Sequence, residues 1–172
     1  MRIRDVFFMS LVFAALISAC TEVDTGSPET AGGEFAIYAL SGDLTMDDVI
    51  DLAQVELPEI PVLSMDDLSA YVSATHVIEL EPSVAELLDA LELPGRPFVV
   101  AVDRTPIYAG AFMAAYFSRS YDGVVILWPP MEGGEDMITI QLGYPGADFF
   151  VGEDPRSDAR ILDALRQAGK LR

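Results

Sequence analysis

Apolar residues along this chain fall into short runs that predict strands and into helically spaced stripes that predict helices. The run from residue 97 to 103 is continuously apolar up to its last residue, Asp103, which is typical of a strand buried on both faces of a sheet. Residues 137–142 alternate between apolar and polar side chains, as expected for a strand with one buried face. Other β-branched or aromatic runs predict strands at residues 34–40, 76–80, 107–113 and 123–128.

Four segments predict helices. Residues 82–91 carry apolar side chains at positions i, i+3, i+4 and i+7, and residues 157–169 carry a similar stripe. Residues 45–53 and 64–72 each open with a Thr/Ser-x-x-Asp capping-box pattern, so helices are expected there too. Together the elements predict one α+β domain over residues 35–172, with a mixed sheet of five or six strands and helices mainly on one face.

The first 19 residues have the pattern of an export signal. Residues 1–5 are net basic, and residues 6–19 are almost wholly apolar. An apolar segment of 14 residues suits the core of a signal peptide. A transmembrane helix needs roughly 20 residues. We therefore expect residues 1–19 to be a cleaved signal peptide and not a part of the fold.

Ile17-Ser18-Ala19-Cys20 resembles the lipobox of bacterial lipoproteins, in which an aliphatic residue and two small residues precede a cysteine. The resemblance implies that the thiol of Cys20 receives a diacylglyceryl group, that a signal peptidase cuts before it, and that the new amino group is acylated. Two or more acyl chains, such as palmitate, hold a protein stably on a membrane. An ordinary signal peptide with an incidental cysteine and an uncleaved membrane anchor are the alternatives.

The residues after Cys20 fit a lipid-anchored protein. Residues 20–34 are polar and rich in Gly, Ser, Thr and Pro, which predicts a flexible tether. Thr21 follows the cysteine where inner-membrane lipoproteins of Gram-negative bacteria often have Asp. The expected location is therefore the cell envelope, with the chain anchored through Cys20 and, in a Gram-negative host, on the outer membrane facing the periplasm.

The charge of the chain is strongly acidic and unevenly distributed. Asp and Glu number 28 against 10 Lys and Arg, for a formal net charge of −18. Residues 20–95 contain 17 acidic residues and no Lys or Arg, whereas residues 96–172 contain 10 acidic and 8 basic residues. Phosphate binding needs clustered Lys and Arg, so no nucleic-acid partner is expected. A solvated acidic surface, a surface for a cationic partner and divalent-cation binding remain as interpretations.

Sequence signals for catalysis are weak. One histidine, His76, and one cysteine make no zinc motif, and the chain has neither a nucleophile elbow nor a phosphate-binding glycine loop. We therefore expect no cofactor, no metal site and no catalytic residue. Glycines in the loops 133–136 and 152–154 would nevertheless allow carboxylates to converge on a cation.

Aromatic residues gather in the less charged second half of the chain. Those expected in loops, at residues 116–121 and 144–150, cannot all belong to the core. Exposed aromatic side chains commonly anchor protein partners. The candidate binding residues are Tyr116, Tyr121, Tyr144 and Phe149, together with Arg156 as a possible clamp on a carboxylate.

Two functions of different classes follow from these observations. The favoured one is a non-enzymatic binding or interaction module, anchored in the envelope, with an envelope protein as partner. The alternative is a secreted hydrolase that uses carboxylates in a cleft. The hydrolase requires two converging acidic side chains, at least one of them with a raised pKa.

Overall fold

The computed structural model describes residues 33–172 apart from residues 41–42, 132–133 and 135. The expected signal peptide, Cys20 and the tether up to residue 32 lie outside the described residues. The described part belongs to one compact unit, Ala31–Arg172. Within it, no helix combines the length and the apolar character needed to cross a bilayer.

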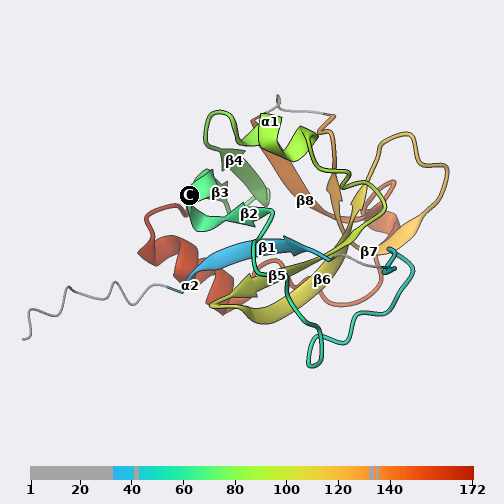
Figure 1. Ribbon diagram of the computed structural model, residues 1–172, viewed down its shortest axis with the longest axis horizontal. Helices are drawn as coiled ribbons and strands as arrows, with labels where there is room; N and C mark the ends of the chain where they lie inside the picture. Colours follow the sequence, from blue (N-terminus) through green and yellow to red (C-terminus); the bar gives the residue numbers. More distant parts are fainter. Residues whose placement is uncertain (1–32, 41–42, 132–133, 135) are drawn as a thin grey trace, which may run out of the picture. The chain divides into compact units, whose positions relative to one another are not determined.

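Eight strands form one mixed sheet (Figure 1). Their order across the sheet is β2-β1-β5-β6-β7-β8-β4-β3, and only the β6–β7 pair is parallel among these neighbours. The sheet consists of β1 (Phe35–Ala39), β2 (Leu63–Ser64), β3 (Leu68–Val72), β4 (Val77–Leu80), β5 (Pro97–Val102), β6 (Thr105–Met113), β7 (Tyr121–Leu127) and β8 (Met137–Tyr144).

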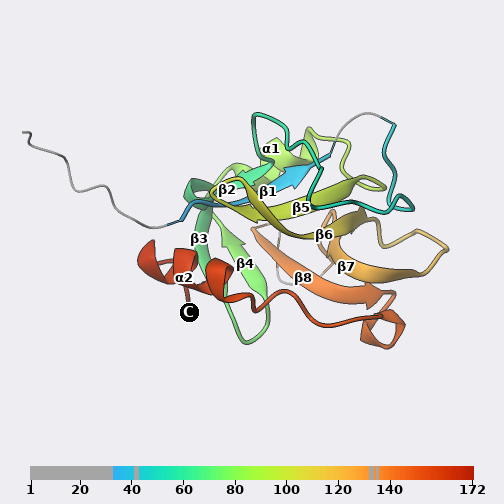
Figure 2. The same ribbon diagram turned by 90° about the horizontal axis from the view of Figure 1, so that it is seen from below.

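The sheet curves back on itself because its two outermost strands are neighbours in the sequence. Only the short 3-10 helix η1 (Met65–Asp67) separates β2 from β3. Figures 1 and 2 show β3 and β4 on the opposite side of the core from β1 and β5. The end of the chain then covers the free edge of β3, where the Tyr71 N–H donates to the Lys170 carbonyl at 2.7 Å. An edge covered in this way is protected from pairing with other chains.

The main core lies inside this curved sheet. Both helices, α1 (Val84–Asp89) and α2 (Ala159–Gln167), place apolar side chains in the same core cluster as the strands. The predicted burial of the continuous apolar strand is confirmed, since residues 98–101 of β5 are fully buried. The rings of Phe98 and Phe112 pack there at 5.1 Å between centroids.

Two predicted helices are absent, and the prediction of five or six strands was wrong because the sheet has eight. At residues 64–72 the capping box forms, with the Ser64 N–H donating to Asp67 at 2.7 Å, but it begins only η1. The residues that follow pair with β4, so tertiary contacts override the local helical pattern. The mixed α+β character of the domain is confirmed.

The other missing helix, at residues 45–53, has no apolar face to bury. The Thr45 hydroxyl donates to Asp48 at 2.9 Å, so the expected capping contact is present. Of the apolar residues at helical spacing, Met46, Val49, Ile50 and Ala53, only Met46 is buried, while Val49 is 97% exposed. A short helix without packing is marginal in water, and the segment adopts turns and irregular structure instead.

Candidate functional site

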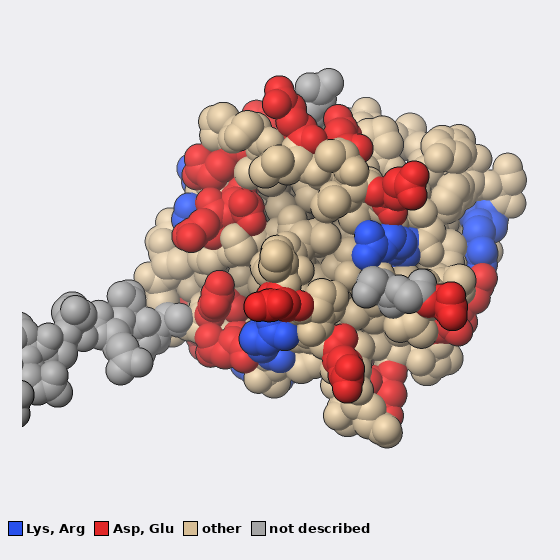
Figure 3. Space-filling view, in the orientation of Figure 1, with Lys and Arg blue, Asp and Glu red and all other residues tan. Residues whose placement is uncertain are grey.

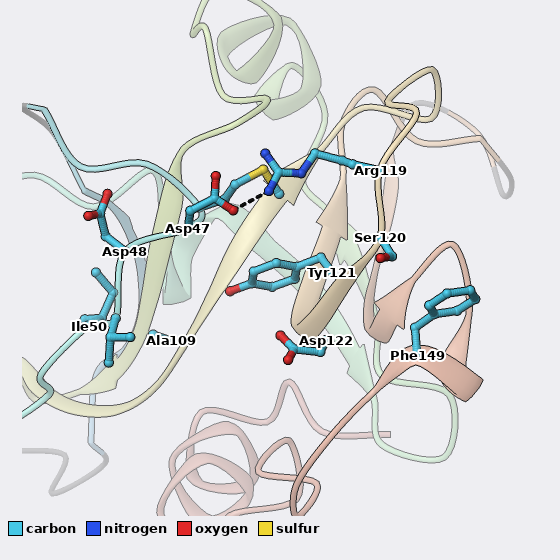
Figure 4. A pocket seen from close by; sticks show the side chains of 11 residues that line it. Asp47, Asp48, Ile50, Ala109, Arg119, Ser120, Tyr121, Asp122 and Phe149 are labelled. Carbon is cyan, nitrogen blue, oxygen red and sulfur yellow. Dashed lines mark hydrogen bonds and ion pairs between the residues drawn. The ribbon is translucent and has the colours of Figure 1, made fainter.

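A groove lies between the irregular segment after β1 and the start of β7. Its cavity of about 470 Å³ is lined by residues 46–50, Ala109, residues 119–122 and Phe149. We call this hollow the Arg119 groove. Figure 4 shows the 46–50 segment on one side and Tyr121, Asp122 and Phe149 on the other.

The first wall is a turn that displays acidic side chains. The carboxylate of Asp48 accepts hydrogen bonds from the Thr45 N–H at 2.7 Å and from the Thr45 hydroxyl at 2.9 Å. These bonds lower the pKa of Asp48 and keep it ionised at neutral pH. Asp47 and the exposed Val49 lie on either side of Asp48, so the wall offers carboxylates with an apolar side chain beside them.

The second wall comes from three separate strand and loop segments. Ala109 lies in β6, Tyr121 and Asp122 open β7, and Phe149 ends the 3-10 helix η2 (Ala147–Phe149). In Figure 4 the Tyr121 ring points across the groove toward the 46–50 segment, with the Asp122 carboxylate beside it. Burial raises the pKa of Tyr121, and the charges of Asp122 and Asp47 raise it further.

Phe149 owes its position to a tight turn after β8. Gly143 has a φ of +67°, and an added Cβ there would lie 2.6 Å from the Gly146 carbonyl and 2.7 Å from the Phe150 nitrogen. Only glycine permits so close a return of the backbone. The loop that folds back in this way carries Phe149, whose side chain remains 47% exposed at the end of the groove.

Arg119 spans the two walls. Its guanidinium forms an ion pair with Asp47, and both side chains are largely exposed. Two further cavities, of about 490 and 360 Å³, adjoin the groove and share Arg119 in their walls. Among the described lining residues of all three cavities, Arg119 is the only cation.

The electrostatic balance of the groove is negative. Asp48 and Asp122 form no ion pair within the described part of the chain. No spare cation is near, because every Lys and Arg between residues 33 and 172 is engaged. Six of these basic residues form ion pairs, and Arg96 and Arg104 donate to backbone carbonyls. Figure 3 shows acidic side chains spread over one face of the domain, with few basic ones among them.

The aromatic residues singled out from the sequence take different positions around the groove. Tyr121 and Phe149 line it. Tyr144 is buried, contrary to the expectation of an exposed loop residue, because it ends β8 opposite Tyr121. Its hydroxyl donates to the Ala115 carbonyl at 2.9 Å and so fixes the loop before β7. Tyr116 is 77% exposed on that loop.

Arg156 lies away from the groove, in a polar cluster at the core. Its guanidinium clamps Asp154 at 2.7 Å and donates to the Ile140 carbonyl at 2.7 Å, with the side chain 13% exposed. The clamp on a carboxylate therefore exists, but it is separate from the aromatic binding surface. It lowers the pKa of Asp154 to about 2.

His76 belongs to the same cluster. The chain turns at His76 with a φ of +54°, and its Nδ1 lies 2.8 Å from the Tyr71 hydroxyl. Burial lowers the pKa of His76, and the Arg156 guanidinium lowers it further against the opposing charge of Asp154. Burial also raises the pKa of Tyr71 to about 12. The hydrogen bond and the burial make His76 a structural residue of this cluster.

This environment predicts an acid-sensitive fold. Because the pKa of His76 is lower in the folded than in the unfolded chain, the unfolded chain binds a proton first as pH falls below about 6.5. The free energy of unfolding should therefore decrease between pH 7.5 and pH 5. His76→Asn removes the titrating group, and Asn tolerates a positive φ.

Urea unfolding of the wild type and of His76→Asn at several pH values measures this effect. We expect the wild type to lose more stability than the variant as pH falls from 7.5 to 5. The pKa of Asp154 is about 2 in the folded protein and about 3.9 in an unfolded chain, so Asp154 changes the stability mainly below this interval. Parallel curves for the two proteins would contradict the assignment.

Comparisons with known proteins identify no relative. No family model matches the chain, and neither a curated protein nor a solved structure is significantly similar to it. The described residues contain no group of three or more His, Cys, Asp and Glu side chains placed to hold a metal ion. Of the loops considered for a cation, residues 133 and 135 lie outside the description, and Asp154 is paired with Arg156.

Sequence reasoning missed the charged part of the groove. Asp47 and Asp48 were assigned to a helix, and Arg119 and Asp122 were not considered. One signal was present, because Arg119 is the only Lys or Arg between Arg104 and Arg156 and stands within the aromatic loop. Its pairing with Asp47, 72 positions away in the chain, depends on tertiary structure.

Proposed function

We propose that this protein is a lipid-anchored component of a bacterial envelope, and that its folded domain is a non-enzymatic binding module with the Arg119 groove as its docking site. The anchor would be the acylated Cys20, and the preceding residues its signal peptide. The lipobox resemblance and the tether-like composition of residues 20–34 support this part of the proposal.

The observation that supports the docking site is a hollow surrounded by exposed apolar side chains. Phe149 lies at its end, and Val49, in its wall, is almost fully exposed. Tyr116 is exposed on the loop before β7, where it packs on Phe117, a residue that lines an adjoining cavity. Val151 is also exposed, and its N–H donates to the Asp122 carbonyl at 2.9 Å, which keeps it next to β7. Clustered exposed apolar groups around a concavity are typical of protein interaction sites.

The direction of the pKa shifts favours binding over hydrolysis. Three acidic side chains, Asp48, Asp154 and Asp158, have clearly shifted pKa values, and all three are lowered. A carboxylic acid that protonates a leaving group at neutral pH needs a raised pKa. Hydrogen bonds that stabilise carboxylates, as at Asp48, instead suit a permanent negative surface.

Site-specific photo-crosslinking in the native host tests the docking site. A photo-reactive phenylalanine analogue is placed at Val49, in the wall of the groove, or at Leu87, which is 65% exposed on α1. The proposal predicts one discrete adduct with an envelope component from position 49 and none from position 87. Adducts from position 87 alone would place the interface elsewhere. An adduct with the mass of two copies of this chain would indicate self-association and contradict the proposal.

A further inference from the structure

We propose that the partner segment entering the Arg119 groove carries a basic side chain, arginine or lysine, and that Arg119 occupies the place of this side chain in the free protein. This inference rests on the proposed function and specifies the chemistry of the partner. It concerns the region bounded by Asp47, Asp48, Tyr121 and Asp122.

The lining of the groove suits an organic cation. Carboxylates and an aromatic ring line one space, with Asp122 next to Tyr121 and Asp47 projecting from the opposite wall toward Arg119; Asp48 lies beside Asp47 (Figure 4). Ammonium and guanidinium groups bind over the faces of aromatic rings and pair with carboxylates. The cavity of about 470 Å³ accommodates a long side chain with part of its backbone.

The existing ion pair shows how such a side chain is held. Arg119 already places a guanidinium against Asp47 within this space, and the pair is exposed on both sides. Exposed ion pairs are weak because solvent competes for both partners. A basic side chain from a partner can therefore displace Arg119 from Asp47 without disturbing a buried contact.

Charge complementarity argues against an anionic partner. An anionic partner would meet three carboxylates in the groove against the single guanidinium of Arg119. No other described cation is available to turn toward it, because the remaining basic residues are engaged elsewhere in ion pairs or with backbone carbonyls. A basic partner meets Asp48 and Asp122, which form no ion pair in the described chain.

Two substitutions have opposite expected effects. Arg119→Gln removes the internal competitor and should tighten binding of a basic peptide about threefold, whereas Asp122→Asn should weaken it about threefold, as expected for exposed charge pairs. The matched control is Glu86→Gln on α1, outside the groove. It changes the net charge as Asp122→Asn does and should leave the affinity unchanged.

The measurement is fluorescence anisotropy with the full chain purified in a non-ionic detergent at physiological salt. The probes are fluorescein-labelled peptides of alternating glycine and arginine, or glycine and lysine. Their control is the glycine–citrulline peptide, which has nearly the shape of the arginine peptide without its charge. We expect binding of both basic peptides, and binding of the citrulline peptide at least about threefold weaker.

The inference is overturned if Arg119→Gln weakens binding, if Asp122→Asn behaves like Glu86→Gln, or if the citrulline peptide binds equally well. Absence of binding by both basic peptides up to about millimolar concentration, the weak limit of specific recognition, also overturns it. The photo-crosslink from position 49 separates this failure from that of the proposed function. If the crosslink persists, the groove docks a partner of other chemistry; if it is absent, the docking site itself is wrong.

Discussion

Cys20→Ser is expected to abolish both lipid attachment and signal-peptide cleavage. By the lipobox resemblance, the thiol of Cys20 is the group that receives the diacylglyceryl chain. A cysteine thiol ionises near pH 8.5 and its thiolate is a strong nucleophile, whereas a serine hydroxyl stays un-ionised at such pH. In bacterial lipoproteins cleavage follows lipid transfer, and the resemblance implies the same order for this chain. The variant should therefore keep residues 1–19 and carry no acyl chain.

Metabolic labelling with radioactive palmitate and intact-mass measurement test this prediction together. The wild type should incorporate label and begin at Cys20. Cys20→Ser should be unlabelled, and its mass should exceed that of the wild type by the mass of residues 1–19 less the mass of the lipid. Ser18→Ala is the matched control, because alanine is also a small residue at this lipobox position. Label on Cys20→Ser, or an unlabelled wild type cleaved elsewhere, would contradict the lipid anchor.

Gly110→Ala is expected to have the largest effect on folding. Gly110 lies in β6 between β5 and the parallel strand β7. A Cβ at this position would lie 2.4 Å from the Val124 carbonyl and 2.4 Å from the ring of Phe98. Phe98 is fully buried and cannot move without disturbing Phe112. Overpacking of this kind costs about 3 kcal/mol of stability.

Gly146→Ala provides the control for Gly110→Ala. Gly146 has an extended backbone, with φ of −170°, and no heavy atom lies within 4 Å of the Cβ position. We expect its free energy of unfolding in urea to stay within about 0.5 kcal/mol of the wild type. Equal stability of Gly110→Ala and Gly146→Ala would contradict the close packing of β5, β6 and β7.

The sequence identified the strands whose side-chain pattern is set by local burial. The continuous run of β5 and the alternation in β8 required no knowledge of neighbouring elements. Residues 64–72 could not be assigned without such knowledge. Their capping box forms, but the residues after it pair with β4 and pack in the core instead of forming a helix. Local propensity gives way where strand pairing offers more burial.

The residues of the candidate site also divide into those that the sequence could predict and those that depend on tertiary structure. Aromatic character and an expected loop position singled out Tyr121 and Phe149, which line the groove, although Tyr121 is the first residue of β7 and not a loop residue. Tyr144 was assigned to the same loop, but its strand pairing with Tyr121 buries it and makes it a support for the loop. The position of Asp47 and Asp48 in the first wall of the groove could not be predicted, because it depends on how a long irregular segment packs near the start of β7.

Photo-crosslinking from position 49 in a Phe149→Ala background tests the central claim most directly. The Met131→Ala background is its control, since Met131 is also a large, exposed apolar residue but lies outside the Arg119 groove. The account predicts that the adduct is lost with Phe149→Ala and retained with Met131→Ala. An adduct of unchanged yield in both backgrounds would show that the aromatic end of the groove does not hold the partner.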